Sequence, residues 1–229
     1  LTLITDLLDF AKMEAGKIEL HPATFDLPGC VHNLVALMRF RADQKEIALT
    51  ADLAAALKEI VKPLKRAKAF LQIDEPFFSQ GFRDLGERIR LVDSILEGYP
   101  RELCSIHVCG WLGRQSVLQE LAKMENVEIL SHAFSTGLER DNVKLLKKSL
   151  FEDSGKKLGA GIISVSPLKE EGIESPKTVS DRLGSIASKV GIDNIGFVHP
   201  DCGLRATRSD LVEGVLCNFN EGVKLFEKR

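Results

Sequence analysis

The amino-acid sequence predicts an α/β fold built around a parallel β-sheet. Short, continuously apolar runs of strand length lie at residues 69–73, 106–109, 127–130, 161–165 and 195–198. Amphipathic helical patterns follow these runs at residues 82–97, 114–124, 139–150, 177–190 and 209–226. Apolar runs that alternate with helices are typical of a parallel sheet covered on both faces. A complete (β/α)8 TIM barrel takes about 250 residues. Residues 51–229 therefore fit either a partial barrel with the later five strand–helix units or an open sheet.

A helical segment precedes the first apolar run. Apolar residues at helical spacing predict helices over residues 1–15, 29–44 and 52–67. Pro63 should interrupt the third of these helices, because proline lacks the N–H that an inner helical position donates.

Ser175 followed by Pro176 predicts a helix start, with serine as the N-cap and proline in the first turn. Ser209 is expected to cap the final helix.

The composition is typical of a globular chain with a substantial core. Apolar residues make up 44% of the 229 positions and the formal net charge is −2, so we expect no nucleic-acid partner and no membrane partner. No run approaches the roughly 18 apolar residues of a membrane span, and the N-terminus lacks the features of a signal peptide. Leu1 is not a natural start, so we expect a piece of a longer protein. Five cysteines without disulfide-like spacing favour a reducing, cytoplasmic location.

Two stretches far apart in the chain place soft metal ligands where a strand ends in a turn. Residues 106–110 (IHVCG) offer His107 and Cys109, and residues 199–205 (HPDCGLR) offer Cys202. His107 and Cys109 lie two positions apart, so on a strand both side chains point the same way. Three protein ligands with one open position are typical of a catalytic zinc site. The plainer alternative is that the cysteines belong to the core and the histidine is a structural, hydrogen-bonded group.

The first 50 residues resemble part of a sensor histidine kinase. LITDLLDFAKMEAGK at residues 3–17 is similar to the end of the second dimerisation helix, and FDL at 25–27 and RADQK at 41–45 are similar to the entry to the ATP-binding domain. Neither the phosphoacceptor motif nor the asparagine and glycine boxes accompany them, so kinase activity is not implied. We interpret residues 1–50 as a histidine-kinase-like helical or linker segment and residues 51–229 as a separate α/β region.

Residues 51–229 resemble the C-terminal catalytic barrel of cobalamin-independent methionine synthases, especially the short archaeal members of that family. LQIDEP at residues 71–76, IHVCG and HPDCGLR occur in the family's order and at comparable spacing. The resemblance implies a TIM barrel, a zinc cofactor, and transfer of a methyl group from methyl-folate or a methyl-corrinoid to the thiol of homocysteine, forming methionine. It also implies that Asp74 and Glu75 bind the substrate. A turn or helix-cap role for these carboxylates is the alternative.

Two positions depart from the pattern of that family. The short relatives carry a glutamate as fourth zinc ligand where this chain has Ala133, so we expect a weakened or three-ligand site. The neighbouring His132 could replace the glutamate chemically, but on a strand it would point to the opposite face. Val165 stands where the long members have a histidine that acts as an acid toward the folate. Valine cannot donate a proton, which leaves a corrinoid donor or lost activity open.

Three functions remain open from the sequence alone. The first is a zinc-dependent methyltransferase that acts on homocysteine. The second is a degenerate or chimeric barrel fragment that binds metal or substrate without turnover, and the third is a histidine-kinase fragment in signalling. An incomplete barrel leaves an unpaired strand edge, so we also expect a homo-oligomer or a partner that completes the barrel.

Overall fold

The described part of the chain forms one compact unit. The structure, a computed structural model, describes residues 49–82 and 84–229. By its contacts the chain divides at Arg41, and Ala42–Arg229 forms the unit that contains every described element. The helices predicted over residues 1–15 and 29–44, and the kinase-like segment apart from its last two residues, lie outside the described residues.

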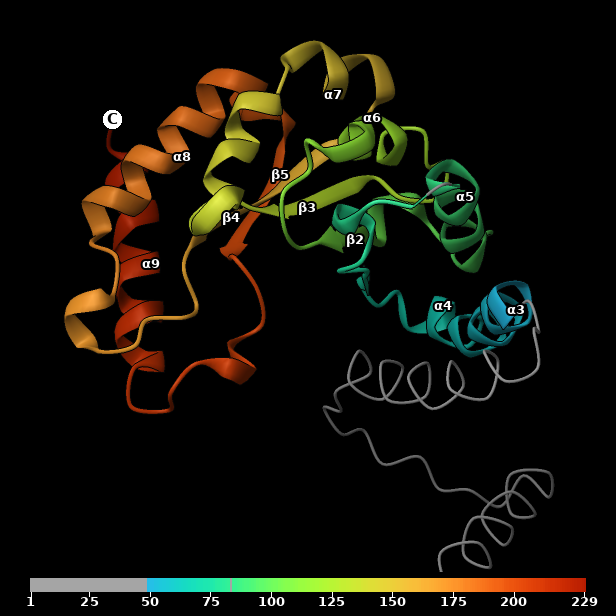
Figure 1. The fold of residues 1–229 in the computed structure, drawn as a ribbon, viewed down its shortest axis with the longest axis horizontal. Coiled ribbons are helices and arrows are strands. Elements are labelled where there is room, and N and C mark those ends of the chain that lie inside the picture. Colours follow the sequence, from blue (N-terminus) through green and yellow to red (C-terminus); the bar gives the residue numbers. More distant parts are fainter. Residues whose placement is uncertain (1–48, 83) are drawn as a thin grey trace, which may run out of the picture. The chain divides into compact units, whose positions relative to one another are not determined.

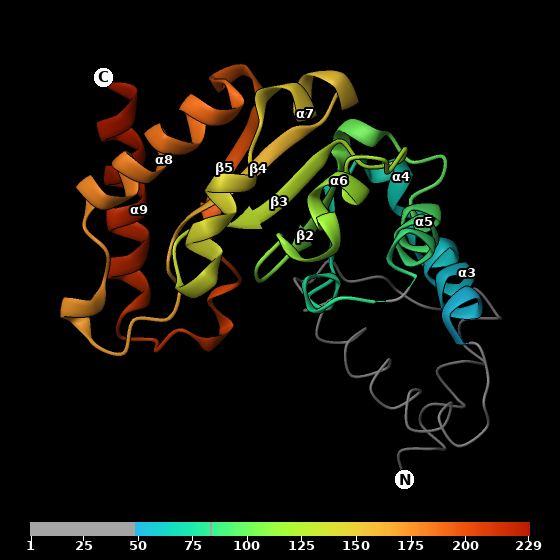
Figure 2. The same ribbon diagram turned by 45° about the horizontal axis from the view of Figure 1, so that its top comes forward.

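Five parallel strands form a single sheet in which the strands keep the order of the chain (Figure 1, Figure 2). Their bounds are β1 Leu71–Asp74, β2 Cys104–Val108, β3 Ile129–Ala133, β4 Lys157–Ile163 and β5 Ile195–Pro200. Every neighbouring pair is parallel. A doubly wound sheet would reverse its strand order at a switch point, whereas a sector of a TIM barrel keeps the sequential order. The predicted α/β fold with five later units of a barrel is confirmed, and the described strands do not close the barrel.

A helix follows each strand. These helices are α5 Leu85–Ile95, α6 Val117–Leu121, α7 Lys148–Ser154, α8 Pro176–Val190 and α9 Val212–Glu227. Before the sheet come α3 Leu49–Val61 and α4 Leu64–Ala67, which are separated at the proline where a break was predicted. Both views show α8 and α9 side by side (Figure 1, Figure 2). Short 3₁₀ helices occur at Phe78–Gln80, Arg101–Leu103, Arg114–Ser116, Glu170–Gly172, Ile192–Asn194 and Leu204–Ala206.

Two local predictions were wrong. The segment predicted as one helix over 139–150 is instead a 3₁₀ helix, Gly137–Leu145, followed by α7. The buried side chain of Asn142 bonds to the backbone of three residues outside this segment, and these tertiary bonds hold it in a tighter path. Ser209 does not cap α9, because that helix begins after Leu211.

The sheet separates an apolar outer face from a polar inner face. Ile106, Leu130 and Leu158 stand in one row across three strands and are fully buried in the cluster that the sheet forms with its helices. The next row along the strands contains His107 and Ser131, paired in register. Successive side chains of a strand alternate between faces, so this second row lies on the face away from the apolar cluster. The fold thereby presents the histidine on the face that the described helices of the apolar cluster do not cover.

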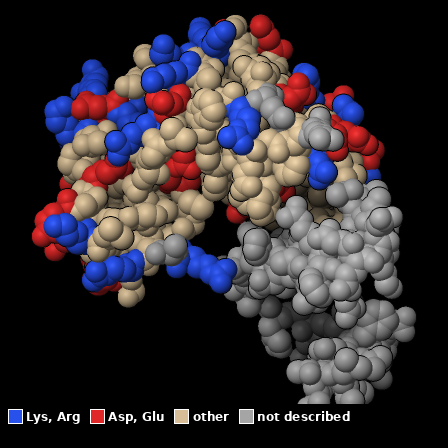
Figure 3. All heavy atoms as spheres, in the orientation of Figure 1, with Lys and Arg blue, Asp and Glu red and all other residues tan. Residues whose placement is uncertain are grey.

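Charged side chains of both signs are interspersed on the described surface in Figure 3. Exposed ion pairs such as Lys148–Glu152 and Lys177–Asp181 join neighbouring turns of single helices, and each such pair contributes at most about 1 kcal/mol. On this face neither sign gathers into an extended patch among the described residues. None of the described helices is long and apolar enough to cross a membrane.

The predicted cap of α8 is present and can be tested. The N–H of Thr178 donates to Ser175 Oγ at 3.2 Å, so Ser175→Ala should lower the free energy of unfolding by about 1 kcal/mol. Urea unfolding followed by circular dichroism measures this change. Ser188→Ala is the matched control, because Ser188 is exposed in the same helix and alanine favours helix formation there. Equal losses in the two variants would contradict the capping role.

Candidate metal centre

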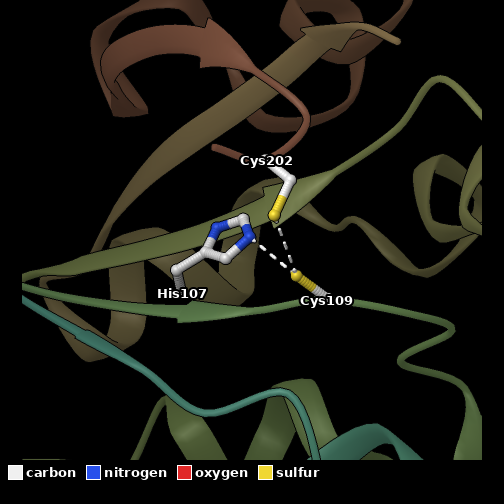
Figure 4. A group of neighbouring side chains, drawn as sticks. All are labelled: His107, Cys109 and Cys202. Atoms are coloured by element: carbon white, nitrogen blue, oxygen red, sulfur yellow. Dashed lines mark hydrogen bonds between the residues drawn. The ribbon is translucent and has the colours of Figure 1, made fainter. Parts of the chain in front are cut away.

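Three side chains predicted as metal ligands converge beyond the carboxyl ends of β2 and β5. His107 comes from β2, Cys109 from the residue just past that strand, and Cys202 from the loop after β5 (Figure 4). His107 Nε2 lies 3.1 Å from Cys109 Sγ, and the two sulfur atoms are 3.8 Å apart. Their ligand atoms all lie within 4.8 Å of one another. His107 is buried, Cys109 is half-buried and Cys202 is exposed, so the group opens to solvent on the cysteine side.

A tightly held turn fixes Cys109. Gly110 has φ of 92°, in the left-handed region that favours glycine. Its N–H donates to Glu139 Oε1 at 2.8 Å, and its carbonyl oxygen accepts from Asn142 Nδ2 at 2.9 Å. Asn142 also donates to the carbonyl oxygen of Ala133 at the end of β3. These bonds anchor the turn to the neighbouring strand, which keeps the Cys109 thiol above the end of the sheet.

Asp201 anchors the loop that carries Cys202. Its buried carboxylate accepts from the N–H of Phe134 at 3.2 Å, from the N–H of Ser135 at 3.1 Å, and from the Ser135 hydroxyl. Gly161 lets this loop approach, because a Cβ at that position would stand 2.9 Å from the Asp201 Cα. Burial raises the pKa of Asp201 to about 6. Sequence reasoning did not single out this residue, although it lies inside the HPDCGLR motif.

The two thiols differ in how readily they ionise. The hydrogen bond with Cys109 and the neighbouring His107 side chain lower the pKa of Cys202 to about 4. The hydrogen bond with Cys202 and burial raise the pKa of Cys109, because a second thiolate would lie beside the first. Without a metal, the two cysteines therefore carry one negative charge between them. A bound divalent cation would favour ionisation of the second thiol.

The predicted substrate residues lie at the end of β1, next to the cluster. Asp74 pairs in register with His107, and its carboxylate accepts from Gln72 Nε2 at 2.8 Å. The Glu75 N–H donates to the carbonyl oxygen of His107 at 2.9 Å. The Glu75 carboxylate accepts from the N–H of Phe77 at 3.0 Å, which is a bond of the turn type. Asp74 is thus placed beside His107, while Glu75 also shapes the turn after the strand.

A comparison with models of known protein families assigns most of the chain to one family. The model of the family described as "Cobalamin-independent synthase, Catalytic domain" matches residues 28–222. The chain belongs to this family. The match covers most of the chain and begins inside the segment over 1–50 that resembles histidine kinases.

Two proteins with sequences similar to this chain are methionine synthases. The one from Methanocaldococcus jannaschii is 31% identical over 192 residues, covering 81% of this chain and 58% of the relative. The one from Methanothermobacter thermautotrophicus is 32% identical over 167 residues, covering 72% and 50%. The chain thus spans about half the length of these relatives. A solved structure of a B12-independent methionine synthase from Shewanella sp. W3-18-1 in complex with selenomethionine aligns with a TM-score of 0.64 at 24% identity. That alignment covers 78% of this chain and 54% of the other, and it supports the barrel-type fold.

Ala133, where the sequence resemblance led us to expect a carboxylate ligand, lies on the inner face of the sheet. Ala133 is two positions beyond Ser131 on β3, so it shares the inner face with His107. His132 is fully buried on the opposite face, where desolvation lowers its pKa to about 3. Among the described residues the cluster contains only the three predicted ligands. The chemical option that His132 replaces the glutamate is therefore wrong, as the strand alternation indicated.

The low pKa of Cys202 predicts its reaction with iodoacetamide in the metal-free protein. Thiolates react and thiols do not, and the thiolate of Cys202 is present above its pKa of about 4. The alkylation rate, measured by peptide mass spectrometry, should therefore change little between about pH 6 and 8. The same cysteine in urea-unfolded protein is the control, and its rate should rise through that range. Parallel pH profiles in the folded and unfolded states would refute the prediction.

Proposed function

We propose that this chain is the metal-binding part of a zinc-dependent methyltransferase that forms methionine from homocysteine. The observation that carries the proposal is the convergence of His107, Cys109 and Cys202 in a chain of the cobalamin-independent synthase family. Zinc–sulfur bonds of about 2.3 Å place two sulfur atoms of a tetrahedral site roughly 3.8 Å apart, and the sulfur atoms here are 3.8 Å apart. The donor set and its spacing therefore fit zinc.

The residues of the site would divide the chemistry among them. The two thiols and the imidazole would hold a zinc ion, which when bound lowers the pKa of a coordinated substrate thiol. Asp74, beside His107 in the sheet, would accept hydrogen bonds from the ammonium group of homocysteine, with Glu75 shaping the same strand end. Methyl transfer forms a sulfur–carbon bond, breaks the bond between the methyl group and its donor, and releases the thiol proton to solvent.

Methyl-folate and a methyl-corrinoid are both retained as candidate donors. Val165 is buried, and its carbonyl oxygen accepts from Thr207 Oγ1 at 2.6 Å, so this position offers no side-chain proton. Methyl-folate, whose leaving group would need a proton from this position, is therefore disfavoured relative to a methyl-corrinoid. Family membership does not favour the alternative of a degenerate or chimeric fragment that binds without turnover. The proposal of a signalling kinase fragment rests almost entirely on residues outside the described part of the chain.

The remaining expectations about partners stay predictions. We propose homocysteine and a methyl donor as the small-molecule partners, with no nucleic-acid and no membrane partner, in the cytoplasm. The edges of the described sheet, at β1 and β5, leave room for the homo-oligomer or completing partner that the sequence predicted.

Zinc analysis of wild type and Cys202→Ser tests the proposal directly. Wild-type protein should retain one equivalent of zinc after gel filtration, measured by mass spectrometry of the metal, and Cys202→Ser should retain little, because a ligand is lost. Cys217→Ser is the matched control, since Cys217 is an exposed cysteine of α9 outside the cluster. Methionine formation from homocysteine is then assayed with each methyl donor. A wild-type protein that retains no zinc contradicts the proposal, and zinc without turnover supports the binding fragment instead.

Restoring the carboxylate should strengthen the site. Ala133→Glu adds an anionic ligand from the inner face, so zinc affinity measured by chelator competition should rise by about tenfold or more. Ala133→Gln is the matched control, because it brings the same bulk into the same buried position without the charge. Equal affinities of the two variants would show that the position does not reach the metal.

A further inference from the structure

A chain of hydrogen bonds runs from the back of His107 across the inner face of the sheet. His107 Nδ1 lies 2.9 Å from Ser131 Oγ, and Ser131 Oγ lies 2.9 Å from His199 Nε2. His199 Nδ1 in turn lies 2.6 Å from the carbonyl oxygen of Pro200. The chain joins β2, β3 and β5 and ends on a group of the backbone.

The carbonyl oxygen at the end of this chain sets the direction of every bond. A carbonyl oxygen can only accept, so His199 Nδ1 must carry the proton. In a neutral imidazole the other nitrogen then accepts, so the Ser131 hydroxyl donates to His199 Nε2. The Ser131 oxygen is left to accept, so His107 Nδ1 donates to it. His107 Nε2 thus keeps its lone pair, and it is this nitrogen that faces Cys109 at 3.1 Å.

The short contact between His199 Nδ1 and the carbonyl oxygen of Pro200 supports this direction. The rings of His107 and His199 meet edge to face at a centroid distance of 5.6 Å, and Phe197 contacts His199 at 5.4 Å. The opposite direction would place two lone pairs 2.6 Å apart between His199 Nδ1 and Pro200, where they would repel each other.

We propose that Ser131 and His199 are positioning residues that hold His107 in the tautomer whose Nε2 is free to bind a metal. The inference rests on the proposed function, because it assigns these residues to the same metal site. Ligating histidines commonly use their second nitrogen in this way, and loss of such a partner weakens metal binding about 10- to 100-fold. Here the partner is a serine, and the group that fixes the serine is a second histidine on another strand.

The tautomer can be read in metal-free protein without any assay of activity. Long-range proton–nitrogen correlation spectra of ¹⁵N-histidine-labelled wild type should show His107 and His199 both protonated at Nδ1. In His199→Phe the ring is kept but the acceptor is lost, so the Ser131 hydroxyl is free to turn toward His107, whose signal should shift toward the Nε2-protonated form. Wild-type His107 protonated at Nε2 would overturn the proposal, and this result needs no variant.

Zinc affinity provides the second measurement. Ser131→Ala and His199→Phe should each weaken zinc binding by about 10- to 100-fold in chelator competition. His132→Phe is the matched control, because His132 is a buried histidine of the same strand on the opposite face. It should leave the His107 tautomer unchanged and the zinc affinity within about threefold of wild type. If Ser131→Ala and His199→Phe both fold, as judged by circular dichroism, and both bind zinc as tightly as wild type, the positioning role is refuted.

The two measurements separate this inference from the proposed function. If wild type binds no zinc while His107 is protonated at Nδ1, the hydrogen-bond chain stands and the metal proposal fails. If wild type binds zinc tightly while His107 is protonated at Nε2 in the metal-free protein, the metal proposal stands and the positioning role fails.

Discussion

The site depends on one buried carboxylate. Cys109 and Cys202 are 93 positions apart in the chain, and chain entropy opposes holding two such distant loops together. Asp201 offsets this entropy, because its carboxylate accepts hydrogen bonds from the first two backbone N–H groups after β3. The bonds are made at the end of β3, which lies between the strands that carry the two cysteines. The distances from Cys202 to the other two ligands therefore depend on a residue that is not itself a ligand.

Two glycines of β4 leave the inner face of the sheet with little side-chain bulk beside Ser131. Gly159 leaves room for the Phe197 ring, and Gly161 leaves room for the backbone at Asp201. With so little bulk between them, Ser131 can reach histidines on two different strands. The same two glycines interrupt the run of apolar residues by which β4 could be predicted from the sequence. We predicted a strand over 161–165, whereas β4 begins at Lys157.

The sequence predicted the features that repeat along the chain and missed those that depend on contacts across it. Apolar runs and helical spacing located five strands and their helices, because burial on one side imposes those periods. The helix predicted over 139–150 was wrong because bonds between Asn142 and the loop after β2 set the path of this segment. The three ligands could be predicted because metal chemistry restricts their residue types. Ser131 and His199 could not, because only strand register brings them to His107.

The placement of the ligands on two distant segments has a thermodynamic consequence. An ion held by both β2 and the loop after β5 binds the folded chain and not the unfolded one, so its binding energy adds to the stability of the fold. At a free concentration 100 times the dissociation constant, the gain is about 2.7 kcal/mol. The metal would act as a non-covalent cross-link between the second and last strands. Metal supply would then affect how stably β5 and the loop after it remain attached to the rest of the sheet, independently of any methyl transfer.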